Sequence, residues 1–333
     1  MKARIRHPGL PRHVQNHRFV CCPRLLSPVP GATEKTEMLK PPDLITSLSN
    51  PKIKEAVKLR EGKYRRRTKK FVIDGIRELD RAIQAGIRIL EIFTVHPQLS
   101  HKNIPHKNIF CKNIPCKSII IRQVTESVFR KISYGDREDG IVAVAEEPVW
   151  TFEAFESAMR QSAKNHSAQH HSAQHHSALH RPAPLLAVVE KVSKPGNLGA
   201  VFRSADAAGF DGVMIADLHL DPFHYNAIRS SLGTVFHVPS VCDSSENICR
   251  WLKEQQFQIA AAWCSGNTIP YTSMDFCRPT AIVLGSEAEG LSSLWNGAGI
   301  TGITLPMHGA ADSLNISVAA GILFYEARRQ RML

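Results

Sequence analysis

The sequence predicts an α/β protein, and the second half of the chain carries the pattern behind this prediction. From Pro184 onward, short apolar runs alternate with runs of helical periodicity. Apolar strands of this kind, separated by helices, are typical of a mostly parallel sheet with helices on both faces. The chain of 333 residues is also long enough for a second domain.

The elements expected in this half follow in chain order. Strands are predicted at 185–192, 212–217, 236–241, 259–264, 280–285 and 303–307. Helices are predicted at 196–209, 226–233, 246–255 and from Ser313 onward. In the last helix, apolar residues recur at the spacing of one helix face, at Leu314, Val318, Ile322 and Tyr325.

The first half predicts a smaller α/β domain at 41–150, and the larger domain occupies 184–333. The smaller domain is expected to contain a helix at 52–60, a basic loop at 60–75 running into a strand, a helix that stops at Gly86, a strand at 89–95 and a turn and strand within 131–147. Two segments are not expected to build a core. They are a basic tail at 1–40 and a linker at 151–183 with a His/Ser/Ala/Gln-rich stretch.

Positive charge is concentrated outside the larger domain. Residues 1–40 carry 8 Lys/Arg against 2 Asp/Glu, residues 41–147 carry 21 against 13, and residues 148–333 carry 13 against 15. This division suits a nucleic-acid-binding region attached to a near-neutral body, and the alternative is a solvated basic surface. Four residues of the run at 60–70 are predicted to contact RNA phosphates: Arg65, Arg66, Arg67 and Lys69.

Composition also bears on the compartment. The eight cysteines form no CxxC pair and do not suit a disulfide scaffold, which indicates a reduced, cytoplasmic protein. No run of about twenty apolar residues occurs, so no membrane span is expected. The first 33 residues hold six Lys/Arg and no acid. They indicate a disordered tail or an early start codon, with a transit peptide as the alternative.

Several motifs that would indicate other chemistry are absent or incomplete. A five-residue repeat starts at His101, His106, Cys111 and Cys116, but its constant spacing is not that of a zinc finger, and we favour repeat expansion in a surface loop over a metal site. The run from Gly285 to Gly290 has P-loop spacing without the following Lys-Ser/Thr. Without GxGxxG, HExxH or GxSxG, a dehydrogenase, zinc protease or α/β-hydrolase is not favoured.

Three segments in the larger domain carry a set of motifs. The segment at 305–331 places a polar loop before a helix, where backbone N–H groups bind polar ligands well, although an ordinary capped helix is the alternative. The complete set is Asn197, Gly199 and Arg203, then Gly285-Ser286-Glu287 with Gly290, then Pro306-Met307 followed by Ser313-Leu314-Asn315. In this order the motifs resemble the signature of the SpoU–TrmH family of RNA ribose methyltransferases, in the SPOUT class, over residues 185–331.

The resemblance implies a fold and a cofactor. It implies a deep trefoil knot near the C-terminus, which periodicity alone does not predict. It also implies S-adenosylmethionine, bent against the knot, with no metal. Carried over to this chain, the cofactor wall is Leu284, Gly285, Gly290, Leu305, Met307, Ser313 and Leu314. Ordinary turns for the glycines and plain core for Met307 and Leu314 are the alternatives.

The resemblance further implies methylation of a ribose 2′-hydroxyl with Arg203 nearest to the reaction. A guanidinium stays protonated at neutral pH, so we expect Arg203 to hold the RNA phosphate and stabilise the oxyanion rather than act as a base. An ion pair with Glu287 or Asp206 is the alternative. The other polar residues carried over are Asn197, Glu287, Ser313 and Asn315, and Glu287 is expected to orient Arg203 or Asn197.

The resemblance extends to RNA binding and assembly. Asn226 and Arg229 match a stretch near the RNA in the family, although residues 221–225 stand where relatives often carry a proline directly before the asparagine. Residues 41–150 resemble, more loosely, the family's RNA-binding domain. This separate domain favours ribosomal RNA over transfer RNA, and the family implies a homodimer through the knotted domain. The rivals are a non-catalytic RNA-binding protein that keeps the fold and a methyltransferase with another substrate.

Overall fold

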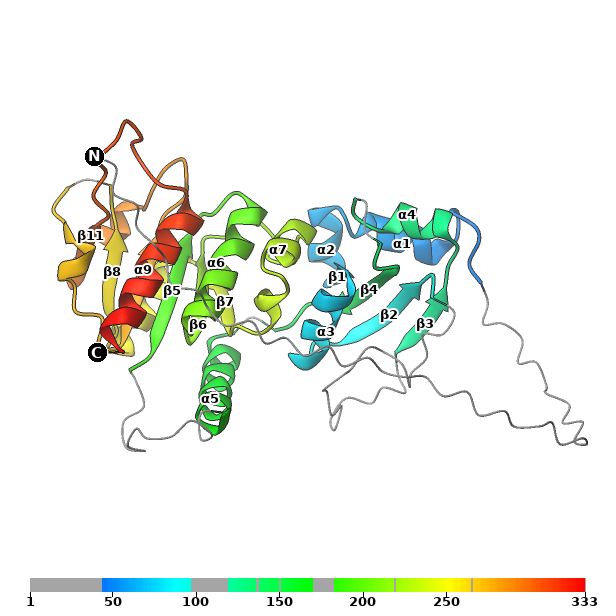
Figure 1. Cartoon of the computed structure of the whole chain (residues 1–333), viewed down its shortest axis with the longest axis horizontal. Coiled ribbons are helices and arrows are strands. Elements are labelled where there is room, and N and C mark those ends of the chain that lie inside the picture. The colour runs from blue at the N-terminus through cyan, green and yellow to red at the C-terminus, as the bar shows by residue number, and fades with distance from the viewer. Residues whose placement is uncertain are drawn as a thin grey trace, which may run out of the picture. The chain divides into compact units, whose positions relative to one another are not determined.

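The computed structural model describes residues 44–96, 119–135, 138–149, 151–169, 183–218, 220–264 and 266–332 (Figure 1). The basic tail, the five-residue repeat and the centre of the His-rich stretch lie outside these residues. Among the described residues, none of the helices combines the length and apolarity that a membrane span requires.

The smaller domain is built on a four-stranded sheet with the order β1-β4-β2-β3. Its strands are β1 (Lys70–Asp74), β2 (Ile89–Thr94), β3 (Ile120–Gln123) and β4 (Ile141–Glu146). Strand β4 pairs antiparallel with β1 and β2, and β2 pairs parallel with β3. The helices are α1 (Pro51–Lys58), α2 (Gly62–Thr68), α3 (Ile76–Gln84) and α4 (Glu126–Ile132).

Helix α2 corrects the prediction of a basic loop at 60–75. Arginine and lysine are good helix formers, and no proline interrupts the run. The helix ends at Lys69, whose φ of 53° is left-handed. The strand predicted to follow it is β1.

The larger domain confirms the predicted parallel sheet. Its seven strands have the order β7-β6-β5-β10-β8-β11-β9, and every recorded pairing is parallel. They are β5 (Leu185–Glu190), β6 (Gly212–Ala216), β7 (Ser240–Asp243), β8 (Gln258–Ala262), β9 (Ile269–Pro270), β10 (Thr280–Leu284) and β11 (Ile300–Thr304). The helices are α6 (Pro195–Ala208), α7 (Tyr225–Ser230), α8 (Ser245–Glu254) and α9 (Ile316–Gln330).

Two apolar clusters lie on the two sides of this sheet. One contains residues of α6 and α9, which lie side by side (Figure 1), and the other contains residues of α8. The first cluster continues into the smaller domain, because Phe71 and Ile73 of β1 belong to it together with Phe223 and Phe236. The two sheets therefore share one core.

Two predicted strands are shifted in the structure. The run at 236–241 is a strand only from Ser240 onward, since residues 234–236 form a 3₁₀ turn and Pro239 has no N–H for the ladder. The strand predicted at 303–307 is β11, which ends at Thr304 and leaves Pro306 and Met307 in a loop. In both cases apolar residues next to a proline predicted a strand where the structure has a turn or a loop.

The predicted linker begins with a helix, α5 (Phe152–Gln169). Phe155 is 1% exposed, and its ring lies edge-on to Trp251, 5.9 Å between centroids. Trp251 Nε1 also donates to Glu156 Oε1 over 3.1 Å. The prediction of a linker that builds no core is wrong for this part, because Phe152, Phe155 and Met159 recur on one helix face and complete the second core.

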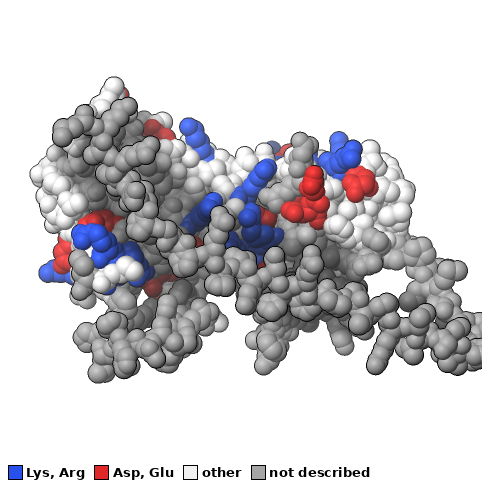
Figure 2. All heavy atoms as spheres, viewed as in Figure 1, with Lys and Arg blue, Asp and Glu red and all other residues white. Residues whose placement is uncertain are grey.

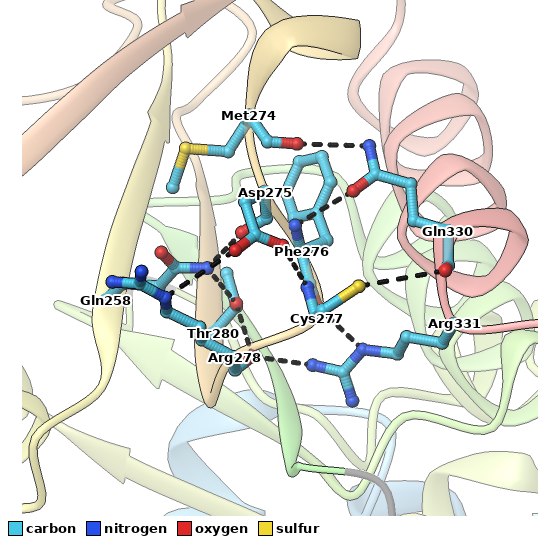
Figure 3. Close-up of polar contacts among 9 residues, drawn as sticks. All are labelled: Gln258, Met274, Asp275, Phe276, Cys277, Arg278, Thr280, Gln330 and Arg331. Atoms are coloured by element: carbon cyan, nitrogen blue, oxygen red, sulfur yellow. Dashed lines mark hydrogen bonds and ion pairs between the residues drawn. The ribbon is translucent and has the colours of Figure 1, made fainter. Parts of the chain in front are cut away.

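Polar contacts at the C-terminus fix α9 (Figure 3). Arg331 donates to the carbonyls of Phe276 and Arg278, both over 2.7 Å, and Gln330 Nε2 donates to the carbonyl of Met274 over 3.0 Å. Arginine side chains thus satisfy carbonyl groups of the segment before β10. These contacts hold the C-terminal end of α9 against the segment before β10.

Candidate active site

The three motifs meet at one edge of the parallel sheet. The first follows β5 and opens α6, the second follows β10, and the third lies between β11 and α9. Strands β5 and β10 are direct neighbours. The carboxyl ends of parallel strands lie at the same edge, which is where open α/β sheets bind ligands.

A chain of hydrogen bonds joins the three motifs. Asn197 Nδ2 donates to Glu287 Oε1, and Asn315 Nδ2 donates to Asn197 Oδ1 over 3.3 Å. Ser193 Oγ donates to the other carboxylate oxygen of Glu287 over 3.4 Å. Of the two partners considered for Glu287, the structure gives it Asn197.

Asn315 also caps helix α9. Its Oδ1 accepts from the backbone N–H of Ser317 over 2.9 Å and from Ser317 Oγ over 2.7 Å. Ser313 and Leu314 precede the cap and are exposed, so both are accessible to a ligand at the sheet edge. An N-terminal turn capped in this way leaves backbone N–H groups facing the loop.

Arg203 lies on α6 with its side chain exposed. Within the described part of the chain it makes no hydrogen bond or ion pair, so the alternative pairing with Glu287 or Asp206 is not formed there. The guanidinium is free to bind a phosphate or a developing negative charge.

The loop after β10 is folded tightly on itself. Ser286 and Gly290 exchange two backbone hydrogen bonds of 3.1 Å, and Gly290 has a φ of 68°. A Cβ on Gly285 would lie 2.2 Å from the carbonyl carbon of Gly290. Glycine at 285 is therefore required by backbone contact, while at 290 it is favoured by a left-handed conformation.

The remaining residues of the predicted cofactor wall differ in exposure. Leu284 is buried, and Leu305 and Met307 are half-buried. Leu314 is 38% exposed, and Val318, Ile322 and Tyr325 behind it are exposed as well. Val318, Ile322 and Tyr325 lie on α9 as predicted, whereas Leu314 precedes its N-cap; the stripe faces solvent, while Ala320, Leu323 and Phe324 face the core.

Glu190 is a site residue that the sequence analysis missed. It is fully buried at the end of β5 and accepts from Ser245 Oγ over 2.7 Å, from the N–H and Oγ of Ser292, both over 2.7 Å, and from Trp295 Nε1 over 2.8 Å. The carboxylate holds Ser292, at the end of the second motif, against β5, the strand before the first motif. The signal in the sequence was an acidic residue at the end of an otherwise apolar strand.

The predicted RNA-binding arginines do not share one environment. Arg66 and Arg67 of α2 are exposed, and Lys69 is exposed but pairs with Glu147 over 3.5 Å. Arg65 is 4% exposed and bonded to Asp221, so its prediction as a phosphate contact is wrong. The prediction failed because Arg65 lies on the inner face of helix α2 and not in an exposed loop.

Exposed groups that could contact RNA remain on both domains. Figure 2 shows Lys and Arg side chains gathered in the middle of the visible face. Asn226 and Arg229 of α7 are exposed, as are Arg66 and Arg67 of α2. A basic surface of this kind attracts phosphates without reading sequence.

Comparisons with known proteins agree with this geometry. Residues 184–325 match the SpoU rRNA Methylase family, and residues 50–143 match the MRM3-like substrate binding domain. A 23S rRNA (uridine(2479)-2′-O)-methyltransferase of Streptomyces viridochromogenes is 32% identical over 148 residues, which are 43% of this chain and 52% of that protein. A 23S rRNA (guanosine(2553)-2′-O)-methyltransferase of Bacillus subtilis is 33% identical over 42% of this chain and 56% of that protein. The chain thus aligns with about half the length of these curated relatives.

Solved structures match over a larger share. An RNA 2′-O ribose methyltransferase is 34% identical with a TM-score of 0.65, and the match covers 87% of this chain and 100% of that chain. An AdoMet-bound rRNA methyltransferase of Sinorhizobium meliloti is 26% identical with a TM-score of 0.69, over 86% of this chain and 97% of that one. With three motifs joined at one sheet edge and a relative matched over its whole length, this chain belongs to the SpoU rRNA methylase family.

Proposed function

We propose that this protein transfers a methyl group from S-adenosylmethionine to a ribose 2′-hydroxyl in RNA, with ribosomal RNA as the substrate. The observation that carries the proposal is the hydrogen-bond chain from Glu287 through Asn197 to Asn315, which unites the three motifs. The relatives named for methylation of 23S rRNA support the choice of RNA. A match to the MRM3-like substrate binding domain supports a role for the smaller domain in holding it.

The residues at the sheet edge fit the cofactor. At Gly285 the loop at 285–290 presents main chain without a side chain, and the close backbone of Gly290 and Leu291 leaves no room for a Cβ there. Half-buried Leu305 and Met307 suit a flat apolar ring. We assign the wall to the seven residues predicted from the sequence and place the knot in the segments around them.

In this assignment the cofactor would supply a methyl group from its positively charged sulfur. The rest of the cofactor would leave as a neutral thioether. Positioning contributes most of the rate, because the hydroxyl, the methyl and the sulfur must lie in line. Exposed Arg203 would hold the RNA phosphate and stabilise the negative charge that develops on the 2′-oxygen as the hydroxyl proton passes to solvent water. Glu287 orients Asn197, which in turn accepts from Asn315, and Ser313 and Asn315 hold the target nucleotide and the loop.

We also propose that the active form is a homodimer paired through the larger domain. The stripe Leu314, Val318, Ile322 and Tyr325 supports this, because three large apolar side chains of α9 and Leu314 directly before its cap are between 37% and 55% exposed. The same apolar stripe of a second copy could cover these side chains, because a two-fold axis places identical surfaces against each other. Ile322→Glu should give a monomer in sedimentation, whereas exposed Gln84→Glu on α3 should leave the wild-type mass. A wild-type monomer at working concentration would refute the dimer.

The function is tested by two measurements on the full chain. Titration calorimetry should detect S-adenosylmethionine binding in the presence of a chelator, and radiolabelled methyl should then appear on ribose 2′-oxygen in bulk ribosomal RNA. Binding without transfer to any RNA would favour a non-catalytic RNA-binding protein. We propose the cytoplasm as the compartment, which fractionation of cells followed by detection of the protein would test.

A further inference from the structure

A buried ion pair links α2 of the smaller domain to the segment at 221–233 of the larger domain. Arg65 of α2 donates through Nε to Asp221 Oδ2, and the side chains are only 5% and 13% exposed. Its Nη1 donates to the carbonyls of Leu59 over 2.7 Å and Arg60 over 2.8 Å. A planar guanidinium with three acceptors is held in one orientation, and it holds Asp221 in turn.

Asp221 sets the start of α7. Its Oδ1 accepts from the backbone N–H of Phe223 over 2.8 Å, and its carbonyl accepts from the N–H of His224 over 3.0 Å. His224 Nδ1 then accepts from the N–H of Asn226 over 3.2 Å, which caps the helix. A helix of six residues depends on its caps, so the orientation of α7 follows from Asp221.

Further contacts hold α7 and its flanks against the smaller domain. The rings of Tyr134 and Tyr225 are stacked 3.8 Å apart. Arg81 Nη1 donates to the carbonyl of Leu232 over 2.6 Å, at the end of the same segment. The segment is thus fixed from α2, from α3 and from the turn after α4.

The opposite side of α7 touches the helix of the first motif. A Cβ on Gly199 would lie 2.2 Å from the carbonyl oxygen of Ala227 and 2.1 Å from Ser230 Oγ. Gly199 stands two residues after Asn197 and one helical turn before Arg203. With no free space between the helices, a displacement of α7 displaces the residues of the first motif.

We propose that Arg65 and Asp221 are positioning residues for methyl transfer. The pair does not contact RNA. It sets α7, and α7 sets Asn197 and Arg203 relative to the domain that holds the RNA, so that the bound ribose meets the reactive geometry. This inference rests on the proposed function, because it concerns the same reaction. It also gives a role to residues 221–225, which depart from the pattern common in relatives.

Kinetics of the full chain separate this role from RNA binding. We expect Arg65→Ala to lower kcat at saturating ribosomal RNA by about tenfold or more, because misplacement by about 1 Å has such effects. The dissociation constant for S-adenosylmethionine should stay within twofold. The control Glu61→Gln, at an exposed residue directly before the same helix, should leave both kcat and KM for RNA within twofold. A kcat for Arg65→Ala within twofold of wild type would overturn the proposal.

A second variant guards against a trivial loss of folding. Arg65→Ala leaves a buried carboxylate without its partner, whereas Arg65→Met with Asp221→Asn removes both charges and should restore the thermal midpoint. The proposal expects kcat to stay low in this stable double variant. Recovery of kcat together with stability would reduce the pair to a structural role and overturn the inference. A wild-type protein that methylates no RNA would instead overturn the proposed function, and the inference with it.

Discussion

Two arginine-bearing helices, α2 of the smaller domain and α6 of the larger one, use the same residue type in opposite ways. Arg65 is buried and bonded to a carboxylate and two carbonyl groups, whereas Arg203 is exposed and has no partner in the described chain. A buried arginine bonded to protein acceptors contributes to the fold, while an exposed unpaired one is available to a ligand. Charge density along the sequence does not distinguish the two, but burial does.

The largest expected effect comes from removing the available arginine. Arg203→Ala should lower turnover by about 10²-fold or more, because loss of one oxyanion-stabilising donor has effects of this size. Calorimetry should show nearly unchanged S-adenosylmethionine binding. Arg203→Lys should recover little, since a point charge does not replace a planar fork. If lysine restores most of the activity, the bidentate part of the argument is wrong.

Glu190 extends the comparison to a buried group of the site. Glu190→Ala leaves the donors of Ser292 and Trp295 unsatisfied in the core and should lower the free energy of unfolding by about 3 kcal/mol. Glu190→Gln keeps an acceptor and should lose about 1 kcal/mol by the same reasoning. Chemical denaturation measures both. Equal losses in the two variants would mean that the packing of the side chain, and not its acceptors, is what matters.

The exposed arginines of α2 sharpen the contrast with Arg65. Neutralising Arg66 and Arg67 together should weaken RNA binding and flatten the slope of log affinity against log salt by about two units or slightly less. Filter binding at several salt concentrations measures the slope. Glu61→Gln, on an exposed neighbour, serves as a control that should not flatten it. An unchanged slope in the double variant would place the RNA contacts elsewhere, around Asn226 and Arg229.

The sequence predicted the parallel sheet well because its central strands β5, β6 and β10 are buried throughout and their apolar residues are continuous or nearly so. It also predicted which motif residues meet, since Asn197, Glu287 and Asn315 are joined in the structure. It did not predict the burial of Arg65, because its acceptors include Asp221, a residue 156 positions away. Glu190 was missed for a similar reason, since Ser292 and Trp295 are distant in sequence.

The smallest expected effect lies inside the second motif and compares its two glycines. Gly290 has a φ of 68° but open space where a Cβ would stand, so Gly290→Ala should lower stability by about 1 kcal/mol through backbone strain alone. Gly285→Ala puts a Cβ 2.4 Å from the backbone nitrogen of Leu291, which must move.

Cofactor affinity separates the two variants. Gly285→Ala opens the loop that we assign to S-adenosylmethionine and should weaken binding at least tenfold, whereas Gly290→Ala should stay within about threefold of wild type, consistent with ordinary turn strain. Calorimetry on both proteins gives the ratio. Equal affinities would mean that the loop adjusts at little cost, and the close backbone contact at Gly285 would then serve the fold and not the ligand.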